Sequence, residues 1–256
     1  MVKKINMYNP FSLEGKTILV TGSTSGIGRG VAIECSKMGA RVIVTGRNQE
    51  RLEETVSELK GSNHIALTSD LATQEGVEKL IEACPQLNGC VLNAGMPKVN
   101  SIKHMKRKDL EEIISVNEIA PIMLTSLLTR KKKLEKNSSI VFISSPNGVQ
   151  IALNGNSAYA ATKGAISAFM KTAALELSAN GTRVNAILPG LVPTRILELS
   201  NSMTPEDEMR EKKASQYPLG FGTPEDIAFG CIYLLSDAGR WVTGINLFID
   251  GGRCIN

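Results

Sequence analysis

Histidine and aromatic residues are scarce in this chain of 256 residues, which has two histidines, one tryptophan and 4% aromatic residues in all. Its five cysteines, Cys35, Cys84, Cys90, Cys231 and Cys254, form an odd set without CxxC spacing. His64 begins an apolar segment, and His104 has no partner at ligand spacing. These absences argue against a disulfide framework and against a zinc site, so we expect no metal.

Long apolar runs and a large excess of one charge are also missing. No stretch approaches the roughly 18 continuous apolar residues of a membrane-spanning helix, and no apolar segment follows Lys3 and Lys4 as it would in a signal peptide. The net charge is only +4, and the basic residues at 130–136 are expected to form a solvated helix end. We therefore expect a cytoplasmic protein that binds neither nucleic acid nor membranes.

Short β-rich apolar segments alternate with segments of helical period. The predicted strands are residues 17–21, 41–45, 64–68, 90–92, 139–144, 183–188 and 245–250. Asn48 precedes a predicted helix over 49–60, and Thr223-Pro224 opens another that ends at Leu235. The alternation predicts an α/β fold, with a seven-stranded parallel sheet and helices on both faces.

The length favours a single domain over two. The one long irregular stretch, residues 189–222, contains four prolines and many charges. In an enzyme such a segment is typical of a lid over the substrate.

A glycine-rich loop follows the first predicted strand and precedes a helical segment. It reads Thr21-Gly22-Ser23-Thr24-Ser25-Gly26-Ile27-Gly28. Glycines let the backbone turn tightly and approach a pyrophosphate, while the helix that follows offers free amides and the positive end of its dipole. At the first strand-to-helix crossover, this loop predicts a doubly wound, Rossmann-type domain that binds a dinucleotide.

The second predicted strand ends at Thr45-Gly46-Arg47-Asn48, about 20 residues past the loop, where this fold contacts the adenosine ribose. An acidic residue there would favour NAD. Because this chain has Arg47, whose planar guanidinium suits a 2′-phosphate, NADP(H) is expected, with help from Thr24, Ser25 and Asn48. The alternative is that Arg47 is an ordinary solvated arginine.

Tyr159 and Lys163 lie four residues apart in a predicted helix, which places them on one face. Half-ionising a tyrosine near neutral pH needs a pKa drop of about 3 units, or roughly 4 kcal/mol. A cation about 4 Å away in a partly buried site supplies energy of that order. By itself the pair is common on amphipathic helices.

Together with the glycine-rich loop, this pair resembles the short-chain dehydrogenase/reductase family, and the resemblance extends from Gly15 to Gly252. The matching segments, in the order of the family, are Thr21 to Gly28, Asp70-Leu71, Asn93-Ala94-Gly95, Asn117, Ser145, Tyr159, Lys163, Asn185, Pro189-Gly190, Thr194 and Asp250-Gly251-Gly252. The joint match is far more specific than any of its parts.

The resemblance implies a ketone–alcohol oxidoreductase with Asn117, Ser145, Tyr159 and Lys163 as catalytic residues. Ser145 would polarise the carbonyl, Tyr159 would give a proton to the developing alkoxide, and Lys163 would hold the nicotinamide ribose and lower the tyrosine pKa. Asn117 would anchor a water that relays the replacement proton. The other implied cofactor contacts are the loop residues Gly22 to Gly28, then Asp70, Leu71, Asn93, Ala94, Gly95, Pro189, Gly190, Val192 and Thr194. The resemblance further implies a homotetramer.

Several positions depart from the family pattern. Leu92 replaces the first asparagine of the fourth-strand motif, and Asn88 stands near the position of its aspartate. The segment from Ser145 to Tyr159 is one residue longer than the family pattern, which predicts a bulge at 150–156 beside the substrate. Pro121 interrupts the helix after Asn117, and a kink there would free backbone groups to hold water.

The substrate is less sharply indicated than the reaction. The stretch from Pro218 to Asp226 is similar to that of 3-oxoacyl-[acyl-carrier-protein] reductases, but sugar, polyol and hydroxysteroid dehydrogenases share it. An acidic carrier protein would need basic docking residues; Lys136 lies where such reductases have one, whereas Asn180 replaces another. A non-catalytic NADP-sensing protein on the same fold is a third hypothesis.

Overall fold

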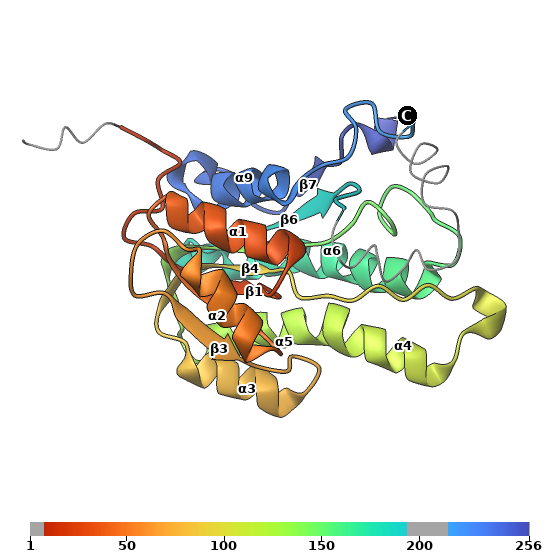
Figure 1. Cartoon of the computed structure of the whole chain (residues 1–256), viewed down its shortest axis with the longest axis horizontal. Coiled ribbons are helices and arrows are strands. Elements are labelled where there is room, and N and C mark those ends of the chain that lie inside the picture. The colour runs from red at the N-terminus through yellow and green to blue at the C-terminus, as the bar shows by residue number, and fades with distance from the viewer. Residues whose placement is uncertain (1–7, 194–214, 256) are drawn as a thin grey trace, which may run out of the picture.

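The computed structural model describes residues 8–193 and 215–255 (Figure 1). The described strands are β1 (Thr17–Thr21), β2 (Arg41–Gly46), β3 (Ile65–Thr68), β4 (Leu87–Leu92), β5 (Leu134–Ile143), β6 (Arg183–Pro189) and β7 (Asn246–Ile249). All seven predicted strands are confirmed. β4 and β5 start earlier than predicted because Leu87 pairs with Leu134 across an irregular register, and the polar residues at 135–137 hid this extension in the sequence.

The strands form one parallel sheet in the order β3-β2-β1-β4-β5-β6-β7. The strand order reverses between β1 and β4, and ligands of doubly wound sheets bind at the carboxyl ends of the strands beside that point. The glycine-rich loop follows β1, Asn93 follows β4, and Ser145 lies shortly after β5. The predicted doubly wound fold is therefore confirmed, and its switch point gathers three of the predicted motifs.

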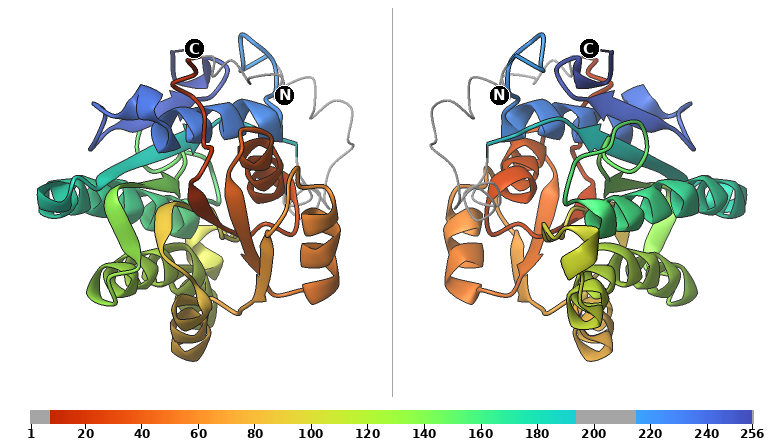
Figure 2. Two further views of the ribbon diagram at one scale, coloured as in Figure 1. Left: turned by 90° about the vertical axis from the view of Figure 1, so that its left-hand side faces the viewer. Right: turned by 90° about the vertical axis from the view of Figure 1, so that its right-hand side faces the viewer.

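Helices cover both faces of the sheet (Figure 2). The described helices are α1 (Gly26–Lys37), α2 (Gln49–Ser57), α3 (Gln74–Ala83), α4 (Arg107–Ile114), α5 (Ala120–Arg130), α6 (Ser157–Leu177) and α9 (Pro224–Leu235). One buried apolar cluster lies between the sheet and α3, α5 and α6, and a second lies between the sheet and α1, α2 and α9. Cys35 and Cys231 belong to the second cluster, as expected for core packing.

Side-chain caps fix the start of three helices. Asn48 accepts a hydrogen bond from Arg51 N, and Thr73 accepts one from Gly76 N. At α9, Thr223 and Asp226 form the predicted capping box. α2 ends at Ser57 rather than at Lys60. Of the predicted lid at 189–222, residues 194–214 lie outside the described residues.

α4 and α5 form one continuous helical stretch, Arg107–Arg130, joined by the π-helical turn η2 (Ser115–Ile119). Among the described helices, this stretch alone has the length and hydropathy of a possible membrane span. It packs against α3, β5 and α6, and 44% of its most apolar window is buried inside the fold. It therefore lies in the helical layer below the sheet in Figure 1, partly buried against the fold.

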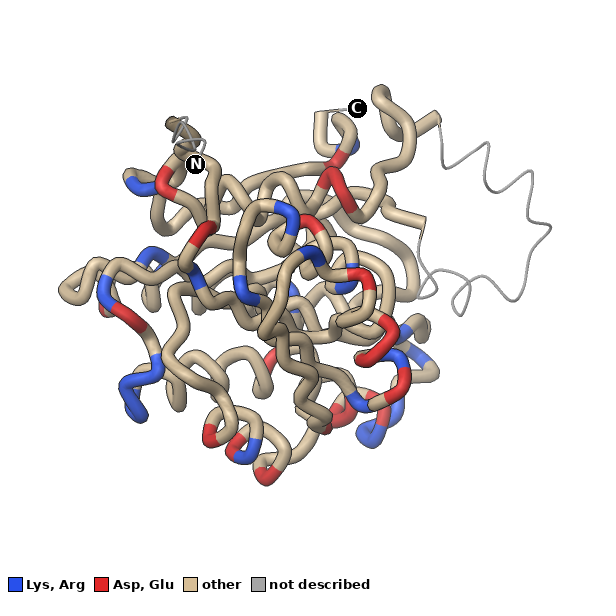
Figure 3. Tube along the Cα trace, turned by 60° about the vertical axis from the view of Figure 1, so that its left-hand side comes forward, with Lys and Arg blue, Asp and Glu red and all other residues tan. Residues whose placement is uncertain are grey.

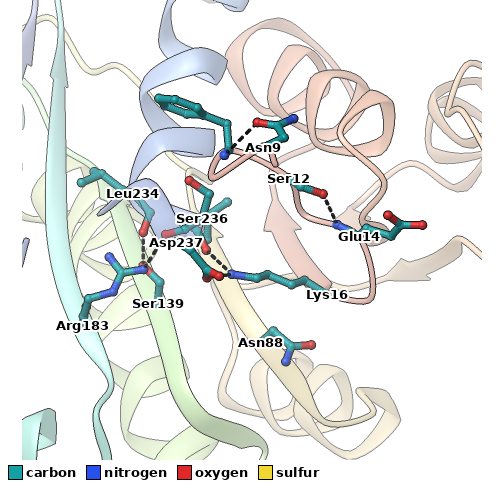
Figure 4. A network of polar contacts seen from close by, with 12 residues as sticks. Asn9, Ser12, Glu14, Lys16, Asn88, Ser139, Arg183, Leu234, Ser236 and Asp237 are labelled. Atoms are coloured by element: carbon teal, nitrogen blue, oxygen red, sulfur yellow. Dashed lines mark hydrogen bonds and ion pairs between the residues drawn. The ribbon is translucent and has the colours of Figure 1, made fainter. Parts of the chain in front are cut away.

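Away from the motifs, polar contacts tie the strands to α9 and to the residues just after it (Figure 4). Lys16 Nζ lies 2.8 Å from Asp237 Oδ1, and Ser139 Oγ donates to Leu234 O at 2.8 Å. Arg183 donates to Ser236 O. Asn88, at the family's aspartate position, accepts a hydrogen bond from Thr17 N at 2.8 Å and so ties β4 to β1.

Candidate active site

The glycine-rich loop is held closely against the end of β4. Asn93 Nδ2 donates to Thr21 O at 2.9 Å, and Thr21 Oγ1 accepts from Asn93 N and Ala94 N. A Cβ on Gly28 would lie 2.3 Å from Gly22 O, and one on Gly22, which has a φ of +69°, would lie 2.9 Å from Ala94 Cα. Glycine is required at both positions because backbone atoms of neighbouring residues occupy the space that a Cβ would need.

The start of α1 suits a phosphate group. Unlike Asn48 and Thr73, its N-cap residue Ser25 makes no side-chain hydrogen bond to the helix, and the first turn contains no acidic residue. The amides and the positive dipole end of α1 are therefore not neutralised by the N-cap side chain or by an acidic residue of the first turn. Ser23 is fully buried: its hydroxyl donates to Val20 O, its N–H donates to Thr45 O and its carbonyl accepts from Thr55 Oγ1, so the predicted contact at this position is turned into the fold.

Arg47 lies just beyond β2, beside this loop. Gly46 lets the two segments come together, since a Cβ there would lie 2.7 Å from Thr24 Cγ2. Arg47 is exposed and has no ion-pair partner among the described residues. The Asn48 side chain is used as the N-cap of α2. A guanidinium without a carboxylate partner here can receive an anion.

Asn117 is almost completely buried, and its amide is fixed by the segment after β4. Its Oδ1 accepts from Met96 N at 2.8 Å, and its Nδ2 donates to Met96 O at 3.0 Å. It lies within η2, where the hydrogen bond from Ala120 N to Ser115 O spans five residues. In a regular α-helix the Asn117 carbonyl would accept from residue 121, but Pro121 has no N–H. The predicted interruption at Pro121 thus takes the form of a π turn.

Lys163 lies deep in the site and close to Asn117. A Cβ on Gly95 would lie 3.3 Å from Asn117 Oδ1 and 3.6 Å from Lys163 Nζ. Lys163 Nζ donates to Ile143 O at 2.8 Å and lies 5.7 Å from the centre of the Tyr159 ring. Burial lowers the pKa of the Lys163 ammonium to about 8.

Tyr159 and Ser145 meet at the mouth of the same site. Burial raises the pKa of the Tyr159 phenol, and its hydrogen bond with Ser145 acts in the opposite direction.

The remaining predicted contacts border this centre or lie outside it. Asp70 is exposed and accepts from Ala72 N, while Leu71 is buried in the core. Gly190 donates to Ile249 O beside Asp250, and Val192 is buried. Thr194 lies outside the described residues.

Sequence reasoning gave no role to Asn147, which the structure places beside Ser145. Its backbone N–H donates to Ser145 Oγ at 3.1 Å. Asn147 is 3% exposed, and neither polar atom of its buried side chain has a hydrogen-bond partner among the described residues. The one sequence signal was its position two residues after the serine, where hydroxyl-to-backbone turns are common.

Comparison with known proteins agrees with this geometry. The family model described as Enoyl-(Acyl carrier protein) reductase matches residues 22–253. The chain belongs to the short-chain dehydrogenase/reductase family. It is accordingly an oxidoreductase that acts on alcohols or ketones.

Relatives in this family differ in substrate and cofactor. The 3-oxoacyl-[acyl-carrier-protein] reductase FabG of Rickettsia felis is 32% identical over 94% of this chain and 97% of its own. A Beutenbergia cavernae structure provisionally assigned as a gluconate 5-dehydrogenase, with NADP bound at low occupancy, is 30% identical with a TM-score of 0.87 and covers 97% and 100% of the two chains. A 3-ketoacyl-(acyl-carrier-protein) reductase from Brucella melitensis, complexed with NADH, is 28% identical with a TM-score of 0.85 and covers 95% and 100%.

Proposed function

We propose that this protein is an NADP(H)-dependent reductase of 3-oxoacyl thioesters. The observation that carries the proposal is the convergence of Ser145, Tyr159 and Lys163: the serine hydrogen-bonds the phenol, and a buried ammonium lies 5.7 Å from the ring centre. Two hydroxyl groups that can reach one substrate carbonyl, with a lysine ammonium close to the phenol, suit proton transfer to an alkoxide.

Each residue of this group receives one role. Ser145 donates a hydrogen bond to the substrate oxygen, its own oxygen being held by Asn147 N. Tyr159 gives its proton to the same oxygen. Lys163 has donors left beyond its bond to Ile143 O and holds the nicotinamide ribose. Because Pro121 has no N–H to donate to the Asn117 carbonyl, this carbonyl anchors the water that returns the proton. When bound, the nicotinamide supplies the hydride.

Arg47 is the main support for NADP(H) over NAD(H). It lies beside Thr24 and Ser25, and no carboxylate neutralises it among the described residues. The pyrophosphate is assigned to the uncapped start of α1, and the adenine to Asp70 and Leu71. The remaining cofactor contacts are those predicted from the family pattern. They come from the segment that ends at Gly95 and from the segment Pro189 to Thr194.

The substrate proposal follows from the FabG relatives, with sugar, polyol or hydroxysteroid oxidation as the competing activity. We further propose a single domain with residues 189–222 as substrate lid, a homotetramer and a cytoplasmic location. A non-catalytic NADP sensor is disfavoured because none of the four polar residues of the site has been replaced.

Turnover of a substrate panel tests both reaction and substrate. 3-Oxoacyl thioesters, sugars and steroids are each assayed with NADPH and NADP⁺, for the wild type and for Tyr159→Phe. We expect the thioesters to be reduced fastest. Tyr159→Phe should lose nearly all turnover yet bind NADPH as tightly as the wild type, because only the proton donor is removed. Substantial activity in this variant would refute the catalytic assignment, and faster sugar oxidation would refute the substrate.

The cofactor assignment is tested with Arg47→Asp. A carboxylate there would repel the 2′-phosphate and accept hydrogen bonds from a 2′-hydroxyl. We expect kcat/KM with NADPH to fall by at least about 100-fold, or roughly 2.7 kcal/mol, and kcat/KM with NADH to rise. Arg130→Asp, a charge reversal at the exposed end of α5, is the control. Wild-type preference for NADH would overturn the assignment.

A further inference from the structure

We propose that residues 99–108, together with the neighbouring residues 149–153, form a docking surface for the acidic carrier protein that delivers the thioester. This inference rests on the proposed function. Figure 1 shows the short turn η1 (Ile102–His104) and the start of α4 projecting at one end of the molecule.

The first argument is an unbalanced positive charge. Residues 98–108 contain five Lys and Arg residues and no Asp or Glu. Two of these are neutralised by α4: Lys98 lies 3.0 Å from Asp109 and 2.9 Å from Glu112, and Arg107 pairs with Glu111. Lys103, Lys106 and Lys108 are exposed and form no ion pair among the described residues. A second basic run, Arg130 to Lys133, also contains no acidic residue, whereas most of the face in Figure 3 carries charges of both signs.

The position of these lysines is unfavourable for the fold itself. Lys106 is the N-cap residue of α4 without a side-chain cap, and Lys108 lies in the first turn. Cations at this end oppose the helix dipole, and Asp109 is the acidic residue of the first turn that partly offsets them. The stability of α4 therefore does not explain why the lysines are present. A negatively charged partner would compensate for their unfavourable interaction with the helix dipole.

Exposed apolar side chains lie within the same surface. Ile102 is 78% exposed, Val99 53% and Leu153 47%. Asn100 N donates to Gly155 O at 2.8 Å, and a Cβ on Gly155 would lie 3.1 Å from Val99 Cγ1, so the two segments lie side by side. A surface with exposed apolar side chains surrounded by cations is complementary to an acidic protein surface that carries a few apolar residues.

Both segments lead directly into the active site. Residues 99–108 follow Gly95 and Met96, which contact Asn117, and 149–153 lie between Ser145 and Tyr159. A carrier bound here would therefore present its thioester at the entrance. The basic residues at 130–136 lie before or at the start of β5, at the end of the parallel strands opposite to Ser145. Of these, Lys131 pairs with Glu82 and Lys133 donates to Cys84 O, whereas the other three form no ion pair among the described residues.

The test compares a triple variant, Lys103→Ala, Lys106→Ala and Lys108→Ala, with a control of equal charge change, Arg130→Ala, Lys136→Ala and Lys171→Ala. The control residues are exposed and lie on other surfaces. Each protein is assayed on a 3-oxoacyl group carried by acyl carrier protein, by CoA and by N-acetylcysteamine. Ile102→Ser is a further variant that leaves the charge unchanged.

For the triple variant we expect kcat/KM on the carrier-bound substrate to fall roughly tenfold or more at low salt, since rim charges mainly change association rates. The effect should shrink as salt rises. kcat/KM on the N-acetylcysteamine substrate should stay unchanged, which also shows that the variant is folded. Ile102→Ser should lose activity only on the carrier-bound substrate.

The alternative outcomes are separable. A wild type that reduces none of the three thioesters refutes the proposed function. A wild type that reduces the N-acetylcysteamine substrate but not the carrier-bound one refutes the docking surface alone. So does a triple variant with unchanged activity on the carrier, one impaired only on CoA, or a control variant that loses activity on the carrier instead.

Discussion

Replacing Lys163 by methionine should remove a pH-dependent cost of folding, while the loss of the hydrogen bond to Ile143 O adds a cost that does not change with pH. The lysine is 5% exposed on α6, and burial lowers the pKa of its ammonium from 10.5 to about 8. Methionine keeps an unbranched side chain of similar size without the charge. Burial of this charge thus lowers the free energy of unfolding, and the protein bears this cost in order to place an ammonium in the site.

The magnitude follows from the two pKa values. A drop from 10.5 to about 8 is worth on the order of 3 kcal/mol, at about 1.4 kcal/mol per unit. Below about pH 8 both folded and unfolded chains are charged, and the full penalty is present. Between about pH 8 and 10.5 the unfolded chain binds more protons, so the stability of the wild type rises with pH, whereas Lys163→Met lacks this contribution.

Urea unfolding followed by far-ultraviolet circular dichroism measures this difference, at one protein concentration because assembly would shift apparent stability. The free energy of unfolding of Lys163→Met, taken relative to that of the wild type, should fall by about 1.5 kcal/mol between about pH 8 and 9.5. Lys171→Met, on the exposed side of α6, should show no such trend. A difference between Lys163→Met and wild type that stays constant over this range would refute the reasoning.

Three further substitutions test how the fold positions the site. Thr223→Ala removes the capping box of α9 and should lower the free energy of unfolding by about 1 kcal/mol in urea; an unchanged midpoint would contradict this. Gly148→Ala, at φ +93° and with a Cβ 2.1 Å from Ala160 O, should destabilise by more than the roughly 1–3 kcal/mol of backbone strain and lower kcat, because the serine loop packs on α6 there. Gly15→Ala, at φ +76° with no atom within 4 Å, is its control, and equal losses would show that strain alone matters. Asn88→Ala leaves Thr17 N without its partner and should cost about 1–3 kcal/mol in urea, a loss that Asn88→Asp should largely restore.

The local parts of this protein could be predicted from the sequence. Apolar segments of strand length separated by helical segments specify the seven strands, because burial on both faces requires continuous apolar residues. The same holds for the caps at Asn48 and Thr223, which depend on bonds over three residues. The glycine-rich loop and the pair Tyr159 and Lys163 are likewise visible as short patterns.

Only the tertiary structure decided the environment of those residues. The sequence placed Lys163 one turn from Tyr159, but its burial beside Ile143 and Gly95 depends on strands far away in the chain. Neither the low pKa of Lys163 nor the buried, unpartnered amide of Asn147 follows from spacing, since both result from desolvation by distant segments. Likewise, which lysines of 98–108 remain unpaired depends on how that loop folds back onto α4.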